Sequence, residues 1–397
     1  MSEQREITQR FRLRYDSDSY RRVVGGKEVI IHCHHYNSRL QRTIEGATEV
    51  DGRAIVSSSA ETVFAEHLRG LIRPEDDEAT RWAVARALYA HLGFGSLNLE
   101  GAADGVVEAP ASHFVEGWLA GFAETNRTVC TFTEGYLQGA YAAVTGKRVR
   151  VREEACMGAG AERCRFVIES GDAGALQDAV KKPLSFTSKR RDGFEHSKNV
   201  DEERIISALV DMPIHGNDMG LIPAFGVYLA NMPADFYNQM CIRFAEAMGQ
   251  KGLFNTARRL LIADAETCAM NTFRGIMSSP EWDGLVAPMI KEERDTLFGI
   301  VAISNALGWG NWHVRTHAPA ERLVMESLNG YEALGYREYR GTSKEPQCFM
   351  LTGVAAGTME LLYSRGSVEE RFGTFISVEQ DCICCDKPSC TFDVNKA

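Results

Sequence analysis

The sequence lacks long hydrophobic runs and any excess of basic residues. No apolar stretch approaches the ~18 residues of a membrane span, and the first residues, MSEQREITQRFRLRYD, are charged throughout, unlike a secretory signal. The protein is therefore expected to be cytoplasmic and to have no membrane partner. With a net charge of −10, it is also not expected to be a general nucleic-acid binder, because neutralising phosphates requires a surplus of Lys and Arg.

Cysteine is abundant, with 11 residues among 397. Because cytoplasmic thiols stay reduced, grouped cysteines predict metal ligands or redox-active thiols rather than disulfides. The hydrophobic content of 44% and charged content of 25% are typical of an ordinary globular chain of two or three domains.

An internal repeat organises the chain. The segments EEAC at 153–156 and CRF at 164–166 recur as EQDC at 379–382 and CTF at 390–392, so each half contains a Cys-x7-Cys pair. Upstream, Glu and Cys again follow in the same order in both halves. The repeated order predicts two diverged tandem copies of one module.

The offsets between the copies support this interpretation. Glu108 and Glu326 are 218 residues apart, as are Cys130 and Cys348, whereas the two Cys-x7-Cys pairs are offset by 226. One insertion of eight residues before the final hairpin of the second copy explains the difference.

The predicted architecture is an α+β (mixed α/β) fold in which the two modules form a pseudo-dimer. Residues 1–175 form the first module, 176–200 a polar linker, and 201–397 the second module, with an extended helical insertion at 254–294. Each module is expected to run from a strand through helices, two strands and two helices to a closing hairpin.

Each copy offers three thiols and a carboxylate, which can fill a tetrahedral zinc site. A closed shell of this kind leaves no position for substrate, so two structural zinc ions per chain are expected. The predicted ligands are Glu108, Cys130, Cys156 and Cys164 in the first copy and Glu326, Cys348, Cys382 and Cys390 in the second.

Alternatives stay open in both copies. In the first, His113 could replace Glu108, or Cys130 could be a small buried apolar residue. In the second, Cys384 and Cys385 add thiols that one zinc ion does not need, which admits an iron–sulfur cluster. The cysteine spacing fits no ferredoxin pattern, however, and the first copy lacks the extra thiols.

The helix with Gly135, Tyr136 and Gly139, the Glu-x2-Cys turn and the Cys-x7-Cys-x-Phe ending resemble the 4-vinyl reductase domain family. The resemblance covers about 60 residues of the first copy and is weaker in the second. It implies a fold shared with vesicle-tethering complex subunits. It also implies a zinc ion held by one Glu and three Cys, as in the ligand-sensing domains of phenol-responsive regulators, beside an apolar pocket for small, often aromatic molecules.

Two further points bear on the resemblance. The nucleotide-hydrolysing and DNA-binding domains of those regulators do not fit in this chain. The Cys-rich ending of the second copy and its GWG segment at 308–310 are also loosely similar to the L-2-amino-thiazoline-4-carboxylate hydrolase family. The expected ligand-contacting aromatics are Trp118, Phe122 and Tyr136, whose spacing suits either a core or a pocket lining.

A histidine-rich segment, IIHCHHYN at 30–37, lies in a predicted strand. Strand alternation places His32, His34 and Tyr36 on one face and His35 on the other. Imidazoles on one face can bind a metal, transfer protons or hold a ligand; the alternative is a solvated edge strand or satisfied core histidines. We expect functional residues here, and removal of His32 and His34 is expected to spare the fold.

These features favour a zinc-stabilised protein that binds an apolar, aromatic or heterocyclic metabolite in its first module. The alternative is a metal- or thiol-dependent enzyme, a hydrolase or reductase that uses His32 and His34, and a pure scaffold is a third hypothesis. No dinucleotide or flavin motif is present. The expected partners are a small-molecule ligand and, in a homodimer, a second copy of the chain.

Overall fold

The computed structural model describes residues 2–99, 101–123, 125–169, 181, 182, 184, 186 and 193–397. It divides into two compact units. Unit 1 comprises Met1–Arg14, Val23–Ala179 and Ile214–Ala247, and unit 2 comprises Tyr15–Arg22, Val180–Pro213 and Met248–Ala397. The units are therefore discontinuous in sequence, unlike the contiguous modules expected from the repeat. Most of the expected linker lies outside the described residues.

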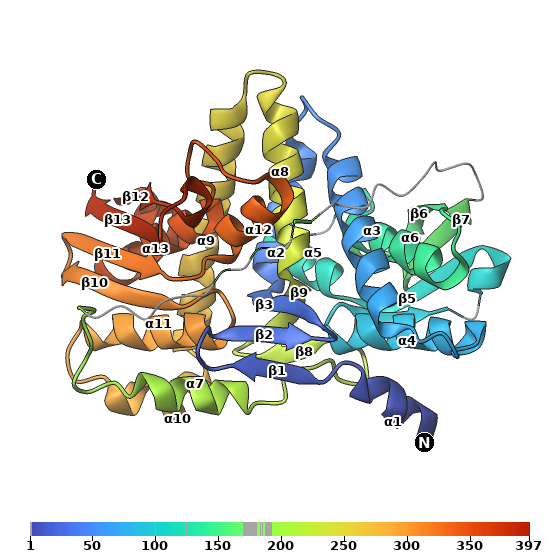
Figure 1. Cartoon of the computed structure of the whole chain (residues 1–397), viewed down its shortest axis with the longest axis horizontal. Coiled ribbons are helices and arrows are strands. Elements are labelled where there is room, and N and C mark those ends of the chain that lie inside the picture. The colour runs from blue at the N-terminus through green and yellow to red at the C-terminus, as the bar shows by residue number, and fades with distance from the viewer. Residues whose placement is uncertain are drawn as a thin grey trace. The chain divides into compact units, whose positions relative to one another are not determined.

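The mixed α/β class is confirmed (Figure 1). From the N-terminus to the first cysteine hairpin, the elements are α1 (Ser2–Gln9), β1 (Leu13–Asp16), β2 (Arg21–Val24), β3 (Lys27–Cys33), α2 (His34–Gly46), α3 (Gly52–Leu71), α4 (Glu78–His91), β4 (Gly95–Asn98), η1 (Ala102–Asp104), β5 (Val106–Ser112), α5 (His113–Phe122), α6 (Thr131–Thr145), β6 (Arg150–Ala155), η2 (Met157–Ala159) and β7 (Cys164–Glu169).

The remaining elements end in the second cysteine hairpin. They are α7 (Glu202–Val210), β8 (Ile222–Ala224), β9 (Val227–Pro233), α8 (Ala234–Gly249), α9 (Phe254–Met277), α10 (Pro280–Leu285), η3 (Ala287–Met289), α11 (Asp295–Ala306), β10 (Trp312–Ala318), β11 (Arg322–Ser327), α12 (Tyr331–Arg340), α13 (Phe349–Tyr363), α14 (Val368–Arg371), β12 (Phe375–Asp381), η4 (Ile383–Cys385) and β13 (Cys390–Lys396).

Each unit contains one four-stranded antiparallel sheet that ends in a cysteine hairpin. The strand order is β4-β5-β7-β6 in unit 1 and β10-β11-β13-β12 in unit 2. In unit 1 the middle strands pair Ala109 with Cys164, and in unit 2 they pair Ser327 with Cys390. Cys164, which opens β7, and Cys390, which opens β13, therefore lie at equivalent places in the two sheets.

A third sheet has the order β1-β2-β3-β9-β8. Its strands β3 and β9 belong to unit 1 and pair antiparallel, with His32 opposite Ala230. The hairpin of β1 and β2 is divided: its tip, Tyr15–Arg22, is assigned to unit 2. This tip lines the pocket of unit 2 that is described below.

In each unit a pair of long helices packs closely because glycines remove the side chains between them. A Cβ on Gly135 of α6 would collide with the backbone carbonyl of Ser57 on α3, and a Cβ on Gly353 of α13 would collide with that of Ile262 on α9. The absence of a Cβ therefore sets the approach of α6 to α3 and of α13 to α9. The glycines noted in the sequence thus have a packing role.

The order of elements in 27–169 repeats in 227–396. Strand, helix, long helix, helix, two strands, two helices and a hairpin with a 3-10 turn follow one another in both segments. The second segment adds α10 and η3 inside the expected insertion at 254–294, and α14 where the eight extra residues were expected. These additions leave the strand order unchanged.

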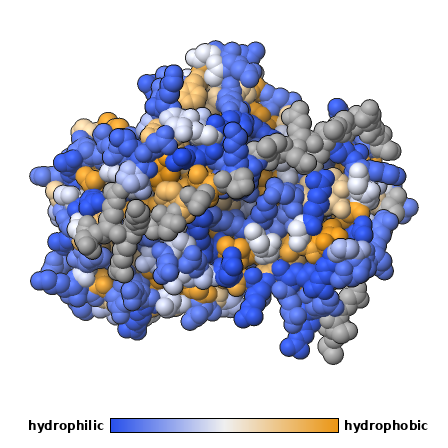
Figure 2. Space-filling model, in the orientation of Figure 1, coloured by the Kyte–Doolittle hydropathy of each residue, from blue (hydrophilic) through white to orange (hydrophobic). Residues whose placement is uncertain are grey.

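The face in Figure 2 is covered mainly by hydrophilic residues, with smaller hydrophobic patches between them. Within the described part of the chain, no helix is both long and apolar enough to cross a membrane.

Candidate metal centres and ligand pockets

The first metal centre lies where the hairpin of β6 and β7 meets the start of α6. Cys130 immediately precedes α6, Glu153 lies on β6, Cys156 follows that strand, and Cys164 is the first residue of β7. All four are buried, and one ligand atom from each lies within 4.8 Å of the other three. The Sγ atoms of Cys130 and Cys164 are 3.6 Å apart.

The local backbone orients these ligands. The 3-10 turn η2 directs the Met157 N–H at Cys164 Sγ, 3.4 Å away, and ends at Gly160, whose φ of +87° suits glycine. The Cys130 N–H donates to Glu153 Oε2 at 2.8 Å. This bond holds the carboxylate beside the thiols and leaves its other oxygen available.

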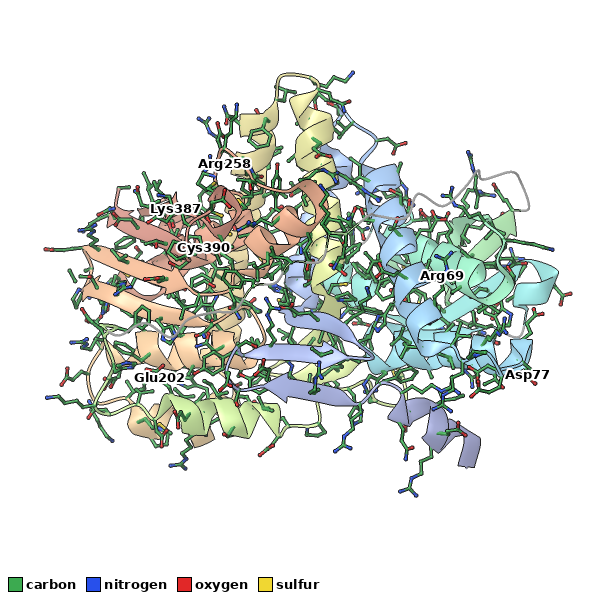
Figure 3. The ribbon with its side chains drawn as sticks, viewed as in Figure 1. Arg69, Asp77, Glu202, Arg258, Lys387 and Cys390 are labelled. Atoms are coloured by element: carbon green, nitrogen blue, oxygen red, sulfur yellow. The ribbon has the colours of Figure 1, made fainter. Side chains whose placement is uncertain are left out.

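The second centre has the same construction. It comprises Cys348, Glu379, Cys382 and Cys390, all buried, with ligand atoms within 4.8 Å of one another; Figure 3 labels Cys390 at the start of β13. The Sγ–Sγ distances are 3.9 Å from Cys348 to Cys382, 3.6 Å from Cys348 to Cys390 and 3.9 Å from Cys382 to Cys390. The Cys348 N–H donates to Glu379 Oε2 at 2.9 Å.

Both groups fit a tetrahedral metal ion. Zinc–sulfur bonds of about 2.3 Å imply sulfur–sulfur separations of about 3.8 Å, and the observed separations are 3.6 to 3.9 Å. In addition, Glu153 Oε1 and Glu379 Oε1 are buried without a hydrogen-bond partner among the described residues. A metal ion would satisfy each of these oxygens.

The electrostatics of the first centre also favour a cation. Hydrogen bonds from the Cys130 and Cys164 thiols lower the pKa of Cys156, whereas burial raises the pKa of Cys130. Burial, together with the charge on Cys156, raises the pKa of Glu153 to about 8. Several negative charges are therefore unfavourable in this buried site unless a divalent cation balances them.

The predicted carboxylate ligands Glu108 and Glu326 lie in neither group of candidate ligands. Glu108 forms an ion pair with Arg163 at 2.9 Å, and Glu326 forms one with Arg315 at 2.7 Å. Directly paired residues share a face of a sheet and adjacent residues alternate. Since the neighbours of Glu108 and Glu326, not these glutamates, pair with the cysteines that open β7 and β13, both carboxylates face away from the thiols.

Glu153 and Glu379 were missed, although the Glu-x2-Cys repeat carried the signal. The alternative ligand His113 does not join the centre either: its Nε2 accepts from Asn37 Nδ2 at 2.9 Å. The alternative interpretation of Cys130 as only a small buried apolar residue does not account for its position, because its Sγ lies within 4.8 Å of the other three candidate ligand atoms.

The second centre has a further buried thiol beside it. Cys384 Sγ lies 3.2 Å from Cys382 Sγ and 3.9 Å from that of Cys385, which is half-buried. The corresponding turn of the first centre contains Gly158 and Ala159. The extra thiols of the second centre are those on which the iron–sulfur alternative depends, and this alternative stays a prediction.

The histidine segment differs from the expected strand. Strand β3 ends at Cys33, and His34 is the first residue of α2, so the face assignment based on strand alternation fails beyond His32. His32 and Tyr36 are each 2% exposed, and their ring centroids are 4.5 Å apart. The rings of His34 and His35 are 4.0 Å apart.

The structure identifies the equivalent positions in the second copy. Because α2 starts at His34 and α8 at Ala234, the residues equivalent to His32, His34 and His35 are Met232, Ala234 and Asp235. The second copy still has no histidine at these positions.

A buried chain of polar groups lies beside these rings. Tyr237 Oη donates to Asn37 Oδ1 at 2.6 Å, and the amide of Asn37 donates to His113 Nε2. Burial lowers the pKa of His32 to about 3 and that of His34 to about 4. These histidines are therefore neutral near pH 7, and they line none of the pockets described below.

The three predicted ligand-contacting aromatics are engaged elsewhere. Tyr136 is fully buried in the core, where its hydroxyl donates to Ala85 O at 2.6 Å. Trp118 packs edge-on against Phe122, and the guanidinium of Arg127 lies 4.9 Å from its ring. None of the three lines a pocket described below.

Unit 1 contains a pocket with an apolar wall and a volume of about 780 Å³. It lies among α1, α4, β4 and the turn at 215–218. Ile7, Phe11 and Leu97 contribute apolar side chains, and the rings of His91 and His215 are stacked 5.7 Å apart at an interplanar angle of 8°. Burial, and then the neighbouring His215, lowers the pKa of His91 to about 4.

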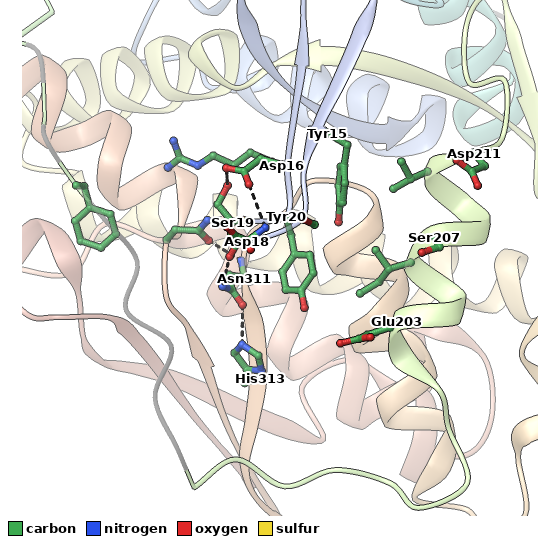
Figure 4. Close-up of a pocket in the computed structure, with 16 residues that line it drawn as sticks. Tyr15, Asp16, Asp18, Ser19, Tyr20, Glu203, Ser207, Asp211, Asn311 and His313 are labelled. Carbon is green, nitrogen blue, oxygen red and sulfur yellow. Dashed lines mark hydrogen bonds between the residues drawn. The ribbon is translucent and has the colours of Figure 1, made fainter.

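Unit 2 contains a more polar pocket of about 950 Å³ (Figure 4). The tip of the β1–β2 hairpin forms one side and α7 the other, and the lining also includes His313 of β10, Asn311 just before this strand and Asn329 just after β11. The close-up shows the rings of Tyr15 and Tyr20 extending toward the side of α7 that carries Glu203 and Ser207. The sequence did not point to Tyr15, Tyr20, Glu203 or Ser207 as pocket residues.

The comparisons with known proteins agree with part of this picture. The 4-vinyl reductase domain family matches residues 119–170, a segment that contains all four groups of the first metal centre. This confirms the resemblance for that segment and does not extend to the second copy. No curated protein matches the sequence.

Among solved structures, the chain is similar to the phenol-responsive sensory domain of the transcription activator PoxR, crystallised with phenol. Sequence identity is 17%, the match covers 42% of this chain and 88% of that chain, and the TM-score is 0.34. At this level of similarity, the phenol site of that domain is not transferred to this chain.

Proposed function

We propose that this chain is a small-molecule-binding protein stabilised by two zinc ions, and that unit 1 binds a small apolar or aromatic molecule. The observation that carries the ligand proposal is the pocket among α1, α4 and β4. Its volume of about 780 Å³ lies in the usual range for small-molecule sites, and such sites combine apolar walls with a few polar groups.

The chemistry of this pocket supports an aromatic ligand. Phe11, which is buried, lies 5.4 Å from His91, whose ring stacks on His215. Because the lowered pKa keeps His91 neutral at pH 7, its imidazole offers a flat surface and a hydrogen-bonding nitrogen without a charge. A neutral ring with one hydroxyl or ring N–H would fit these groups.

Zinc is proposed for both centres because three thiolates and a carboxylate in a tetrahedral arrangement suit this ion. Cys130, Cys156, Cys164 and Glu153 would hold the first ion, and Cys348, Cys382, Cys390 and Glu379 the second. Each bound zinc ion would cross-link a cysteine hairpin to the start of the neighbouring helix, α6 in the first centre and α13 in the second. The full set of four protein ligands leaves no open position, which supports a structural role.

We also propose that residues 1–175 and 201–397 arose by duplication of one module. The matching order of elements and the equal strand order of the two four-stranded sheets support this origin. No catalytic role is assigned to His32, His34, His35 or Tyr36, because three of them are buried and none lines a described pocket.

The ligand proposal is tested by titrating the protein with indole and p-cresol while measuring heat or intrinsic fluorescence. Ala87→Trp places a bulky ring in the pocket from a half-buried position of α4 and should abolish binding. Ala143→Trp, at a half-buried position of α6 outside the pocket, is the matched control and should bind as the wild type does. Equal binding by both variants would place the ligand elsewhere.

A further inference from the structure

The pocket of unit 2 has a chemistry that the proposed function leaves unexplained. Its volume is about 950 Å³, and its walls combine two tyrosine rings with four carboxylates, those of Asp16, Asp18, Glu203 and Asp211. Only one lysine or arginine, Arg21, is among the described lining residues. The pocket is thus aromatic and strongly acidic at once.

Three of the four carboxylates remain available to a ligand. Asp16 accepts hydrogen bonds from Ser19 Oγ at 2.6 Å and from the Asp18 N–H at 3.0 Å. The bond from Ser19, and to a smaller extent the charge of Arg21, lowers the pKa of Asp16. By contrast, the carboxylates of Asp18, Glu203 and Asp211 have no ion-pair partner within the described ranges. Among the described residues, the negative charge of these three groups is therefore not neutralised.

The neighbouring Arg22 does not neutralise them. It is fully buried, and its Nη1 donates to the carbonyl of Ala306 at the C-terminal end of α11 at 3.0 Å. A cation is favourable at that end of a helix, so this guanidinium fixes the hairpin tip against α11. The Tyr15 hydroxyl donates a hydrogen bond to the carbonyl of Asn305, also near the end of α11, at 3.3 Å. This bond holds the Tyr15 ring at the pocket wall.

The spacing of the carboxylates argues against a single metal ion. Glu203 in the first turn of α7 and Asp211, the residue that caps the C-terminus of this helix, are eight residues apart, which corresponds to about 12 Å of helical rise. Across the described chain, the groups that could hold a metal ion are the two cysteine centres, and no carboxylate of this pocket belongs to them. Dispersed charge of this kind suits an organic cation, whose carbon skeleton can also lie on aromatic rings.

We propose that the pocket of unit 2 binds a small organic cation with one or more protonated amines. The ammonium groups lie at the carboxylates of α7, and the carbon skeleton packs against Tyr15 and Tyr20. Tyr20 has a φ of +55°, a backbone conformation that bulky residues rarely adopt, and its ring reaches into the cavity (Figure 4). Ser207, which lies between Glu203 and Asp211 in the sequence, offers a hydroxyl to the same ligand.

Isothermal titration calorimetry of the full chain with tyramine, spermidine and phenylacetate tests this proposal. We expect the two amines to bind, phenylacetate not to bind, and amine affinity to fall as salt is raised from about 0.05 to about 0.3 M because screening weakens exposed charge pairs. Glu203→Gln should weaken tyramine binding about tenfold, and Tyr20→Leu should do the same through loss of the ring contact.

The control is Glu292→Gln, which removes an exposed carboxylate of unit 2 that does not line the pocket. It should leave tyramine affinity unchanged, and unchanged melting temperatures of all variants show that folding is preserved. Ala87→Trp in unit 1 should also leave amine binding intact, which separates this site from the proposed aromatic site. Binding of phenylacetate as tight as that of tyramine, or unchanged affinity in Glu203→Gln, overturns the proposal.

Discussion

Replacing single glutamates distinguishes the two possible carboxylate ligands of the first metal centre. Glu153→Gln removes the charged oxygen beside the thiols but keeps a carbonyl that can accept from the Cys130 N–H, as Glu153 Oε2 does at 2.8 Å. Glu108→Gln removes the carboxylate predicted from the repeat. The structure predicts opposite outcomes for these two isosteric changes.

The expected magnitudes differ widely. Changing a partner outside the ligand shell typically costs about 10–100-fold in metal affinity, so loss of the Glu153 ligand should cost at least about 100-fold, or about 2.7 kcal/mol. Glu108, whose side chain is 35% exposed, contributes an ion pair with Arg163. Such surface pairs contribute about 0–1 kcal/mol to stability, and zinc affinity should not change.

Elemental analysis and chelator competition measure the outcome. The wild-type protein should contain two zinc ions per chain, Glu108→Gln should keep both, and Glu153→Gln should release one at a chelator concentration that the other two proteins withstand. Glu379→Gln and Glu326→Gln repeat the comparison in the second centre. Because a structural metal contributes folding free energy directly, melting temperatures should fall together with zinc content.

Two results would refute this reasoning. Zinc loss in Glu108→Gln with retention in Glu153→Gln would restore the ligand set predicted from the repeat. A wild-type protein that holds no zinc, or that holds iron with visible absorbance, would show that the metal assignment itself is wrong.

Three further predictions concern the fold. His32→Ala should lower the free energy of unfolding by about 2–4 kcal/mol in urea titrations, because the ring is 2% exposed; an unchanged midpoint would restore the expectation that this residue is dispensable for folding. Burial lowers the pKa of His67 and of His91 from 6.5 to about 4. The unfolded state therefore binds more protons than the folded state. Each of these two histidines should lower the free energy of unfolding by up to about 1.4 kcal/mol per pH unit as pH falls from 6.5 to 4, with little effect above pH 7. A free energy of unfolding that stays constant from pH 6.5 to 5 would contradict this. Gly135→Ala should destabilise the protein by several kcal/mol because its Cβ would collide with α3. Gly70→Ala, which has open space around it, should stabilise the protein by about 0.5–1 kcal/mol. Calorimetry in which both substitutions changed the stability in the same direction would contradict the packing argument.

The sequence alone was sufficient for the features that depend on order along the chain. The repeated Cys-x7-Cys pairs, and the cysteine upstream of each pair, predicted the six cysteines that the structure brings together in two groups. Four of these cysteines lie on two short hairpins, which bring them together by themselves. The alternation of helical and strand patterns predicted the mixed α/β class.

Tertiary structure decided everything that depends on which face a side chain occupies. Glu108 precedes Cys130 in the same order as Glu326 precedes Cys348, yet strand pairing turns both carboxylates away from the thiols. One residue of register decides between a ligand and a surface ion pair, because adjacent strand residues face opposite sides. Sequence order alone does not contain that register.

The pockets show the same limit over longer distances. The acidic and aromatic wall of unit 2 combines the hairpin tip at 15–22 with α7 and with residues near 311–329, and no local pattern links segments nearly 300 residues apart. Likewise, helix α2 begins one residue after Cys33, which turns a predicted strand face into a buried helix start. The sequence determined which chemical groups are present and which ones a short hairpin brings together; the packing of distant segments decided which of them meet, because that packing depends on the whole core.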